Sequence, residues 1–434
     1  MKRIHRFPAL TAVTILLLVM AATGAASHVR AQDPAYEQGE LRVYVCCASG
    51  EADLAIREQI NKAFEAAHPG VTVKQEVLPA NTNYFEKLQT MIAAGDTPDV
   101  FDMWEGFVQP YAEAGHLLAL DPYMQPGGLT KDQFDPQILE LNSWNGQLYS
   151  LPIEYVPYPA ALFYNPKLFQ EAGLQPPDAT WTWTELRDAA IKLTKSDGGD
   201  TQQWGLLYDY AFYPQWLSWI WSSGTDFFNA DQTKCNLTDP AAVSALQFWA
   251  DLVNKDKVVP PPGVVESFQG VANGFKAGNV AMYFGAGWDP PGFDAVPDLQ
   301  YGMAPLPKSP TGGQSTYLMN LTWGISAKTE MPRTAWEYAR YFATEGERLR
   351  LESISSVPSY LPLAGKWLTP EKEAKGYQLY LDGVQHANVP GAGAKWEKIS
   401  VIAQSELDLL FAGDASAEDV AKRICTQVDR ELAR

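Results

Sequence analysis

The order of apolar and polar positions near the start of the chain predicts a parallel α/β unit. Three short apolar runs, at 41–45, 71–78 and 99–103, are typical of buried strands. Between them, residues 51–67 and 84–94 carry apolar side chains every three or four positions, as helices packed on a sheet do. A strand–helix–strand–helix–strand order needs crossover connections, so we expect parallel strands in an α/β domain.

The same patterns continue along the rest of the chain. They predict helices at 184–195, 240–254 and 266–277, a strand at 280–284, and a mostly helical tail after residue 369. The chain is too long for one ordinary hydrophobic core, so we expect two domains.

The carboxyl ends of the first strands indicate where a ligand would bind. Ligands of open α/β sheets lie beyond these ends, which here are residues 46–50, 79–81 and 103–105. At the third end, Trp104 and Glu105 offer an aromatic face and a carboxylate. We therefore expect a ligand site at this edge of the first domain.

The N-terminus has the three parts of a secretory signal peptide. Three of the first six residues are basic, residues 9–22 are apolar, and 29–31 offer a cleavage site after small residues. The apolar run is short for a membrane span, which needs about 20 residues. We expect removal of residues 1–31 and export to the periplasm or cell exterior, with an uncleaved membrane anchor as the alternative. The sequence has no cysteine near the cleavage site, so we do not expect lipid attachment.

Charge and aromatic content narrow the class of ligand. The chain has 33 basic and 51 acidic residues; residues 1–31 hold four of the basic residues and no acid, so their removal changes the net charge from −18 to −22. Such a charge repels nucleic acid and anionic membranes and mildly disfavours anionic ligands. The 14 Trp and 20 Tyr are unusually many. Their faces can stack on the C–H faces of sugars while their polar edges meet hydroxyls.

The cysteines are Cys46, Cys47, Cys235 and Cys425. An exported protein meets oxidising conditions, so two disulfides are allowed. We expect a Cys235–Cys425 bridge, which leaves Cys46 and Cys47 as a vicinal bridge or as two free thiols. The spacing contains no C-x-x-C and no accompanying histidine pair, so we expect no metal site.

Five segments, in this order and spacing, carry a family signal. They are FEAAHPGVTV (64–73), YFEKL to AAGDTPDV (84–100), YAEAGHLL to LD (111–121), LFYNPKLF to WTEL (162–186) and FKAGNVAM to GW (275–288). Together they resemble the family 1 extracellular solute-binding proteins of ABC transporters, the group that contains maltose-binding protein. The resemblance covers nearly the whole chain after the signal segment.

The resemblance implies an α/β, two-lobed periplasmic-binding-protein fold (type II-like), with the ligand cleft between the lobes. The two implied lobes are 35–158 plus 303–354 and 160–300 plus 357–434. The implied hinge crossings are near 158–162, 301–305 and 355–358. Closure of the hinge over the ligand would create the shape that a membrane permease reads.

Trp288 is the leading candidate for the ligand site, because it matches a family tryptophan that stacks on sugar; a core position is its alternative. Asp289 follows it and could accept two sugar hydroxyls or cap a turn. The remaining candidates are Tyr84, Trp104, Glu105, Tyr155, Tyr158, Trp219, Trp221 and Trp323. For the three tyrosines a core position is equally expected.

Two details refine this set. Trp216, Trp219 and Trp221 lie within six residues, and their spacing fits neither one helical face nor one strand face. We therefore expect some of them to face the cleft, and choose Trp219 and Trp221. Maltose-binding protein has an acidic–basic pair where this chain has Gly106 and Phe107, which argues against maltose itself.

These observations predict a monomeric binding protein, without enzymatic activity, metal or cofactor, that delivers a mono- or oligosaccharide to an ABC importer. A binding protein for a polyol or a glycerol phosphodiester is the alternative within this class. A secreted glycoside hydrolase is the alternative outside it, because Glu105, Glu154, Glu266 and Asp289 could supply two carboxylates. A G-x-S-x-G nucleophile motif is absent from the sequence.

Overall fold

The computed structural model describes residues 36–46, 51–78, 84–124, 128–197, 200–351, 356–391 and 393–434. The expected signal peptide lies outside these residues. Within the described part of the chain, none of the helices combines the length and apolar character that a membrane crossing requires.

A large mixed sheet contains the strands expected near the start of the chain. Its order is β13-β6-β12-β3-β1-β2, and β14 also pairs with β12. The bounds are β1 Gly39–Val45, β2 Val71–Val77, β3 Val100–Trp104, β6 Ser150–Tyr158, β12 Thr316–Ile325, β13 Val357–Pro358 and β14 Ala387–Asn388. As expected, β1 pairs in parallel with β2 and β3, whereas β12 runs antiparallel to β3 and β6.

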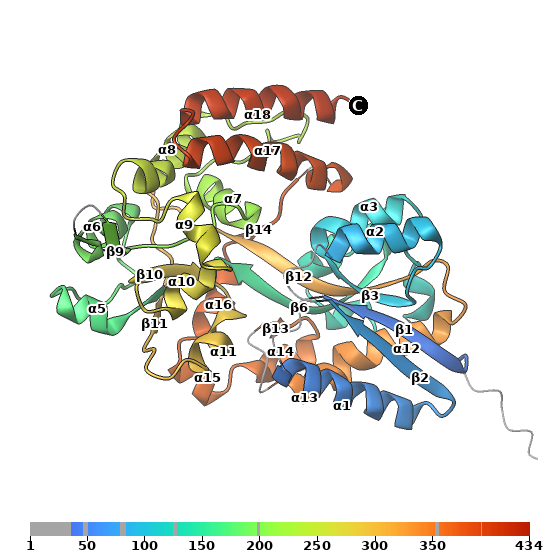
Figure 1. The fold of residues 1–434 in the computed structure, drawn as a ribbon. Coiled ribbons are helices and arrows are strands. Elements are labelled where there is room, and N and C mark those ends of the chain that lie inside the picture. Colours follow the sequence, from blue (N-terminus) through green and yellow to red (C-terminus); the bar gives the residue numbers. More distant parts are fainter. Residues whose placement is uncertain are drawn as a thin grey trace, which may run out of the picture. The chain divides into compact units, whose positions relative to one another are not determined.

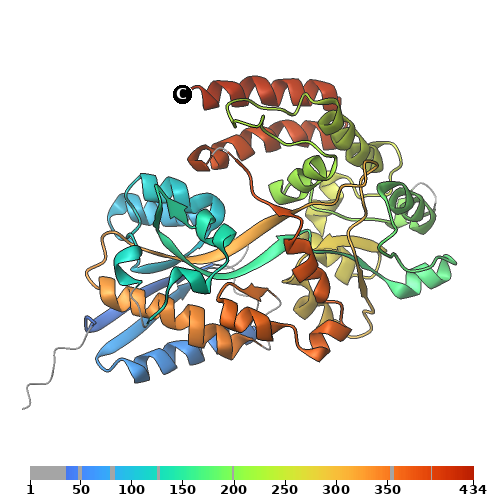
Figure 2. The same cartoon turned by 180° about the vertical axis from the view of Figure 1, so that it is seen from behind.

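Helices cover both faces of the large sheet (Figures 1 and 2). On one face lie α1 (Glu51–Ala67) and α12 (Pro332–Tyr341), whose apolar side chains form a core with Leu41, Val43 and Trp323. On the other face lie α2 (Tyr84–Ala94) and α3 (Glu105–Glu113), which pack on Tyr44, Phe101 and Met103. Successive strand residues point to opposite faces, so each strand feeds both cores.

A small sheet organises the other half of the chain. β7 (Ala161–Tyr164) lies between β10 (Met282–Gly285) and β11 (Gly302–Ala304) and is antiparallel to both. The larger of its cores includes α6 (Trp183–Leu193), α7 (Tyr213–Ser222), α8 (Pro240–Asn254), α17 (Trp396–Phe411) and α18 (Ala417–Leu432). The other includes α10 (Val271–Lys276), α11 (Asp289–Asp294) and α16 (Gln378–Val384).

The remaining elements are short. They are η1 Asp121–Tyr123, η2 Lys131–Gln133, α4 Pro136–Leu141, β4 Ser143–Trp144, β5 Gln147–Leu148, α5 Pro166–Glu171, β8 Lys195–Asp197, β9 Asp200–Gln203, α9 Pro262–Ser267, the π-helical turn η3 Phe342–Gly346, α13 Glu347–Arg350, α14 Leu361–Trp367, α15 Pro370–Ala374 and η4 Gly393–Lys395.

The helix predicted at 266–277 is wrong as a single element. The structure has α9 and α10 instead, separated where Gln269 and Gly270 take φ values of +54° and +130°. A positive φ is incompatible with a right-handed helix, and glycine adopts it without strain. The break turns α10 so that it begins at Val271.

The passages between the two sheets match the expected hinge only in part. β6 and β7 follow one another through Pro159 and Ala160, within the first expected crossing. The second expected crossing, 301–305, contains β11, which still pairs with β7; the chain enters the large sheet only at Thr316. Of the third, 355–358, Ser355 lies outside the described residues, and Val357–Pro358 form β13 of the large sheet. The lobe boundaries therefore stay a prediction.

The expected Cys235–Cys425 disulfide is confirmed. Its Cα atoms are 5.0 Å apart, and it joins the segment before α8 to α18 across 190 residues of sequence. Cys46 is also disulfide-bonded, whereas Cys47 lies outside the described residues.

Replacement of both Cys235 and Cys425 by serine should lower the free energy of unfolding by about 3–5 kcal/mol, because a bridge across a long loop restricts the unfolded chain strongly. Denaturant unfolding followed by circular dichroism measures the change. Non-reducing peptide mapping of the unmodified protein is the control, and a peptide that links Cys235 to Cys46 or Cys47 contradicts the pairing.

Candidate functional site

Three segments leave the small sheet at one edge. Residues 204–207 bridge in parallel to β10, so both run in the same direction. β7 is antiparallel to β10, and its first residue, Ala161, pairs with Gly285, the last residue of β10. The chain after residue 207, the chain after Gly285 and the chain before Ala161 therefore meet at the carboxyl end of β10. This is the edge where α/β sheets place ligands.

A pocket of about 380 Å³ opens at this edge. It brings together three of the sequence candidates, Tyr158, Trp288 and Asp289, from β6 and the start of α11. The other residues that line it are Asp209, Phe212, Gly270, Val271, Ala272, Asn273, Lys276 and Tyr283. The volume lies within the range of small-molecule sites.

Two aromatic rings form one wall of this pocket. Trp288 stacks on Tyr158 with ring centroids 5.4 Å apart and an interplanar angle of 10°. Tyr158 is buried and packs edge-on against Phe212, at 5.0 Å. Trp288 keeps 38% of its surface exposed, which is rare for so large an apolar residue in this structure. The buried tyrosine holds the Trp288 ring in place, and the exposed part of the ring is available to a ligand.

Asp289 fixes the turn that carries Trp288. The residue is 4% exposed, and its Oδ2 accepts a hydrogen bond from the backbone N–H of Ala286 at 2.8 Å. A Cβ at Gly285 would come within 2.6 Å of that oxygen, so the glycine lets the carboxylate fold back. Pro290 follows and favours the helix start. Burial raises the pKa of Asp289 to about 7. The hydrogen bond from the Ala286 N–H and the charge of Lys276 lower this pKa, but burial has the larger effect.

Asp209 is the carboxylate that faces the pocket more openly. It is half-buried, and its Oδ1 accepts one hydrogen bond, from the N–H of Ala211 at 3.2 Å. Burial raises the pKa of Asp209 to about 6, while the Ala211 N–H opposes the rise. At neutral pH the group is mainly ionised and can accept hydrogen bonds from ligand hydroxyls.

The candidates at the end of β3 lie on the other sheet. Trp104 is half-buried among Phe85, at 4.7 Å, and Phe107, at 6.3 Å. Glu105 is 5% exposed, and its Oε2 accepts a hydrogen bond from the N–H of Asn320 at 2.8 Å. Burial raises the pKa of Glu105 to about 7, and its Oε1 accepts no hydrogen bond. Part of its role is thus to tie α3 to β12.

Three candidates are core residues. This corrects the expected place of Trp219 and Trp323 in the cleft, and for Tyr84 it is the core alternative. Tyr84 is 3% exposed, and its hydroxyl donates to the carbonyls of Tyr44 and Asp102. Trp219 is 3% exposed and stacks on Trp249 of α8 at 4.3 Å. Trp323 is fully buried, because it lies on the central strand β12 beneath α12.

Two candidates, Tyr155 and Trp221, are half-buried and belong neither to the core residues above nor to the pocket lining. Tyr155 is half-buried, and it lies three residues before Tyr158, so the two side chains leave opposite faces of β6. Burial raises the pKa of Tyr155 to about 12. Trp221 is half-buried, donates its Nε1–H to Asp226 at 2.9 Å, and stacks near Tyr317.

The sequence reasoning missed Asp209, Phe212, Asn273 and Lys276. A signal for Asp209 was present, since Leu206, Leu207 and Tyr208 are a short apolar run that ends in an acid. That is the pattern that selected Trp104 and Glu105. Residues 271–276 had no comparable signal, because the helix was expected to continue through Gly270.

Comparison with known proteins agrees with this architecture. The profile of the bacterial extracellular solute-binding proteins matches residues 48–348. The chain belongs to this family. A protein of Brucella abortus strain 2308, named only as a binding protein, is 27% identical over 412 residues, 92% of this chain and 94% of its own.

Two further relatives have named ligands. The maltotriose-binding protein of Pyrococcus abyssi is 24% identical over 358 residues, 79% of this chain and 72% of that protein. An ABC substrate-binding protein of Listeria monocytogenes, solved in complex with cycloalternan, superposes with a TM-score of 0.80 at 23% identity, covering 92% of this chain and all of the other. The expected two-lobed α/β fold class is confirmed.

Proposed function

We propose that this solute-binding protein captures a neutral sugar at the edge of the small sheet and presents it to an ABC importer. The observation that carries the proposal is the pairing, in one pocket, of an exposed tryptophan with an ionisable carboxylate. Trp288 offers an apolar face, and Asp209 offers hydrogen-bond acceptors. A sugar has the same two chemistries, C–H faces and hydroxyl edges. The carbohydrate ligands named for the relatives support this reading.

The proposed binding step needs both halves of the chain. The pocket belongs to the small sheet, while half-buried Trp104 lies at the end of β3 on the large sheet. A ligand that touches both would stabilise a closed arrangement, because only that arrangement makes all the contacts. We propose that this closed form is what the permease in the membrane recognises, that the exported protein acts as a monomer, and that its signal segment is removed.

Pocket charge favours a neutral ligand over a glycerol phosphodiester. Asp209 and Asp289 line the pocket together with one cation, Lys276. An ionised phosphodiester would meet Asp209 at close range, which is unfavourable where little water screens the charges. A neutral polyol satisfies the same groups and stays the second candidate. The pocket does not bring Glu105 or Glu154 beside Asp289 as a hydrolase pair; its second carboxylate is Asp209.

Titration with a panel of neutral mono- and oligosaccharides, a hexitol and glycerophosphocholine tests the proposal. At least one neutral sugar should raise the melting temperature and bind with micromolar or tighter affinity by calorimetry, since a ligand specific for the folded state stabilises it by mass action. Chromatography should recover the sugar unchanged after prolonged incubation, and a chelator should leave binding intact. Binding of glycerophosphocholine alone, or conversion of the sugar, would reject the proposal.

Trp288→Ala should lower the affinity for that sugar by about 3 kcal/mol, roughly 100-fold in Kd, because it removes an apolar stacking surface. Its effect on the melting temperature of the ligand-free protein should be smaller. Trp219→Ala is the matched control, since that ring is in the core, and it should destabilise the fold by about 3–5 kcal/mol. A Trp288→Ala protein that melts early but binds normally would place this ring in the core.

Asp209→Asn should weaken sugar binding by about 1.5–3 kcal/mol, because it removes charge-assisted hydrogen bonds at constant size. Wild-type affinity should fall as pH drops through about 6, where the Asp209 carboxylate becomes protonated, and the Asn variant should lack this step. Asp289→Ala is the contrasting variant. It leaves the Ala286 N–H unpaired and should lower stability by about 1–3 kcal/mol. Calorimetry from pH 5 to 8 and thermal melts separate the two roles; equal pH profiles for wild type and Asp209→Asn contradict the assignment.

A further inference from the structure

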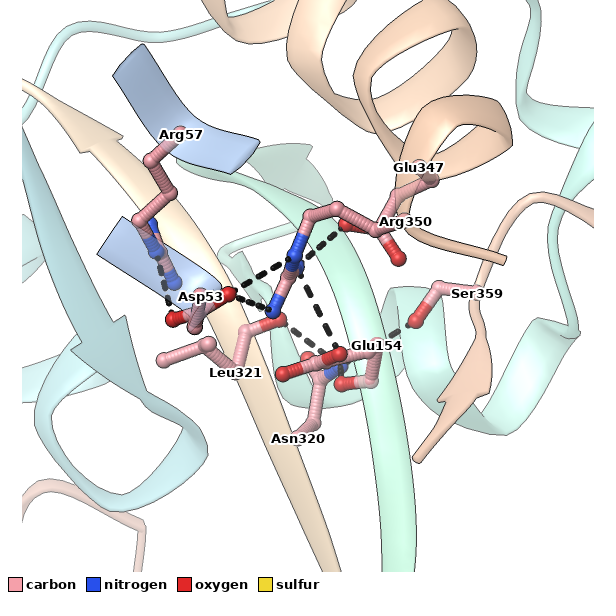
Figure 3. Close-up of polar contacts among 8 residues, drawn as sticks. All are labelled: Asp53, Arg57, Glu154, Asn320, Leu321, Glu347, Arg350 and Ser359. Carbon is pink, nitrogen blue, oxygen red and sulfur yellow. Dashed lines mark hydrogen bonds and ion pairs between the residues drawn. The ribbon is translucent and has the colours of Figure 1, made fainter. Parts of the chain in front are cut away.

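A buried charge cluster lies against strands of the large sheet; Figure 3 shows all of its members except Asp102. Its members come from α1, β3, β6 and α13, and are Asp53, Arg57, Asp102, Glu154, Glu347 and Arg350. Arg350 is at its centre. Its side chain is 5% exposed and contacts Glu347 at 2.5 Å, Asp53 at 3.2 Å and Glu154 at 3.6 Å.

The cluster joins elements that are distant in sequence. Asp53 also pairs with Arg57 at 3.0 Å, one turn along α1. The guanidinium groups of Arg57 and Arg350 both lie over the ring of Phe342, at 5.2 and 5.7 Å. Phe342 opens the π-helical turn that precedes α13. Such turns often mark functional sites, and here the turn precedes the helix that carries Glu347 and Arg350.

A hydrogen-bonded asparagine extends the cluster across the paired strands. Asn320 of β12 donates through Nδ2 to the Glu154 carbonyl at 2.9 Å and to Ser359 Oγ at 3.4 Å. Figure 3 shows Asn320 and Ser359 beside the carboxylates. On β3, Asp102 accepts a hydrogen bond from the N–H of Cys46 at 2.9 Å, where β1 ends. The cluster thus contacts the ends of β1 and β3 and the strand β6.

Acids outnumber bases in this cluster. Among the described residues, four carboxylates face two guanidinium groups. Two carboxylate oxygens, Glu347 Oε2 and Asp102 Oδ1, are buried and accept no hydrogen bond, and buried Glu154 Oε2 has the 3.6 Å ion pair with Arg350 but no hydrogen bond. Full ionisation would leave an uncompensated negative charge away from water, which is strongly unfavourable. The geometry therefore favours the uptake of protons.

The pKa shifts of the cluster agree with its geometry. Burial raises the pKa of Glu347 to about 7; Arg350 lowers it, and Glu154 raises it further. Burial also raises the pKa of Asp102 to about 7, against the charges of Arg57 and Arg350. Arg350 itself stays charged, because the carboxylates around it hold its pKa above the ordinary arginine value.

We propose that this buried charge cluster is a proton-linked clamp, which binds α1, β6 and α13 to one another most tightly when it has taken up protons. None of its six charged residues lines the ligand pocket. The packing of α1 against strand β6 is more stable at acidic pH and less stable at alkaline pH.

The direction with pH follows from proton linkage. The ordinary pKa of an unfolded glutamate is 4.5, whereas burial raises the pKa of folded Glu347 to about 7. Between these values the folded state binds more protons, so stability decreases as pH rises. Stability from this group is fully present below about pH 4.5 and is lost by the time the pH passes about 7.

Glu347→Gln tests the clamp, because glutamine mimics the protonated acid at every pH. The melting temperature of Glu347→Gln minus that of wild type should be at least about 3 °C larger at pH 8 than at pH 5, at constant ionic strength. Glu345→Gln is the matched control: it lies two residues earlier, in an exposed pair with Arg348, and should follow wild type. Parallel wild-type and Glu347→Gln profiles overturn the proposal.

Two direct readouts accompany the melts. In ¹³C-glutamate-labelled protein, the carboxyl resonances of Glu105 and Glu347 should titrate above pH 6 in wild type and Glu345→Gln, and one of these two should be missing in Glu347→Gln. At pH 8, amide hydrogen exchange in α1 and β6 should be slower in Glu347→Gln than in wild type, and equal exchange overturns the clamp. Should Glu347→Gln not fold, Asp102→Asn with ¹³C-aspartate labelling gives the same comparison. Asp289 should titrate above pH 6 in both proteins, and the proposal is overturned when no further wild-type aspartate resonance titrates there and is lost in Asp102→Asn.

Discussion

The pairing of β6 with β12 is the interaction on which the rest of the structure depends. The two strands run side by side through the large sheet and toward the small one (Figures 1 and 2). β6 of the large sheet leads directly into β7 of the small sheet, so the two sheets are joined at this point of the chain. Tyr158, at the end of β6, pairs with Tyr317 and also supports Trp288. Any change in how these strands meet therefore reaches both the pocket wall and the buried charge cluster.

The second constraint is strand direction at the small sheet. Parallel bridging of residues 204–207 to β10 brings the chain after residue 207 and the chain after Gly285 to one edge. Without it, Asp209 and Trp288, which are far apart in sequence, would leave the sheet at opposite ends. Asp289 then locks the turn by accepting the Ala286 N–H. The pocket is thus a consequence of topology first and of individual side chains second.

The sequence predicted elements well where local signals end them. α1, α2 and α8 have the bounds that periodicity gave, because Pro69 and Gly70, Gly95, and Asp239 with Pro240 punctuate them. The 266–277 helix failed since the positive φ of Gln269 has no sequence mark. For the candidate site, Trp288, Asp289 and Tyr158 were found together with residues that proved to be core, such as Trp219 and Trp323. Periodicity does not show which aromatic rings other elements of the fold cover. α7 is buried on more than one face, because β12 and α8 both pack against it.

Charge clusters are harder still to predict, since they depend on contacts across the whole chain. Asp53 and Arg350 are 297 residues apart, and nothing local to either indicates the other. Their chemistry nevertheless sets a limit on function. The proposed sugar site uses Asp209 in its ionised form, whereas the proposed clamp stabilises the fold most while Glu347 holds its proton. A fall in pH therefore acts in opposite directions on the proposed sugar site and on the cluster. Burial is the main cause of both pKa shifts, because it penalises the charged form of each carboxylate. The same physical effect thus opposes the form that the proposed sugar site uses and favours the form that stabilises the cluster.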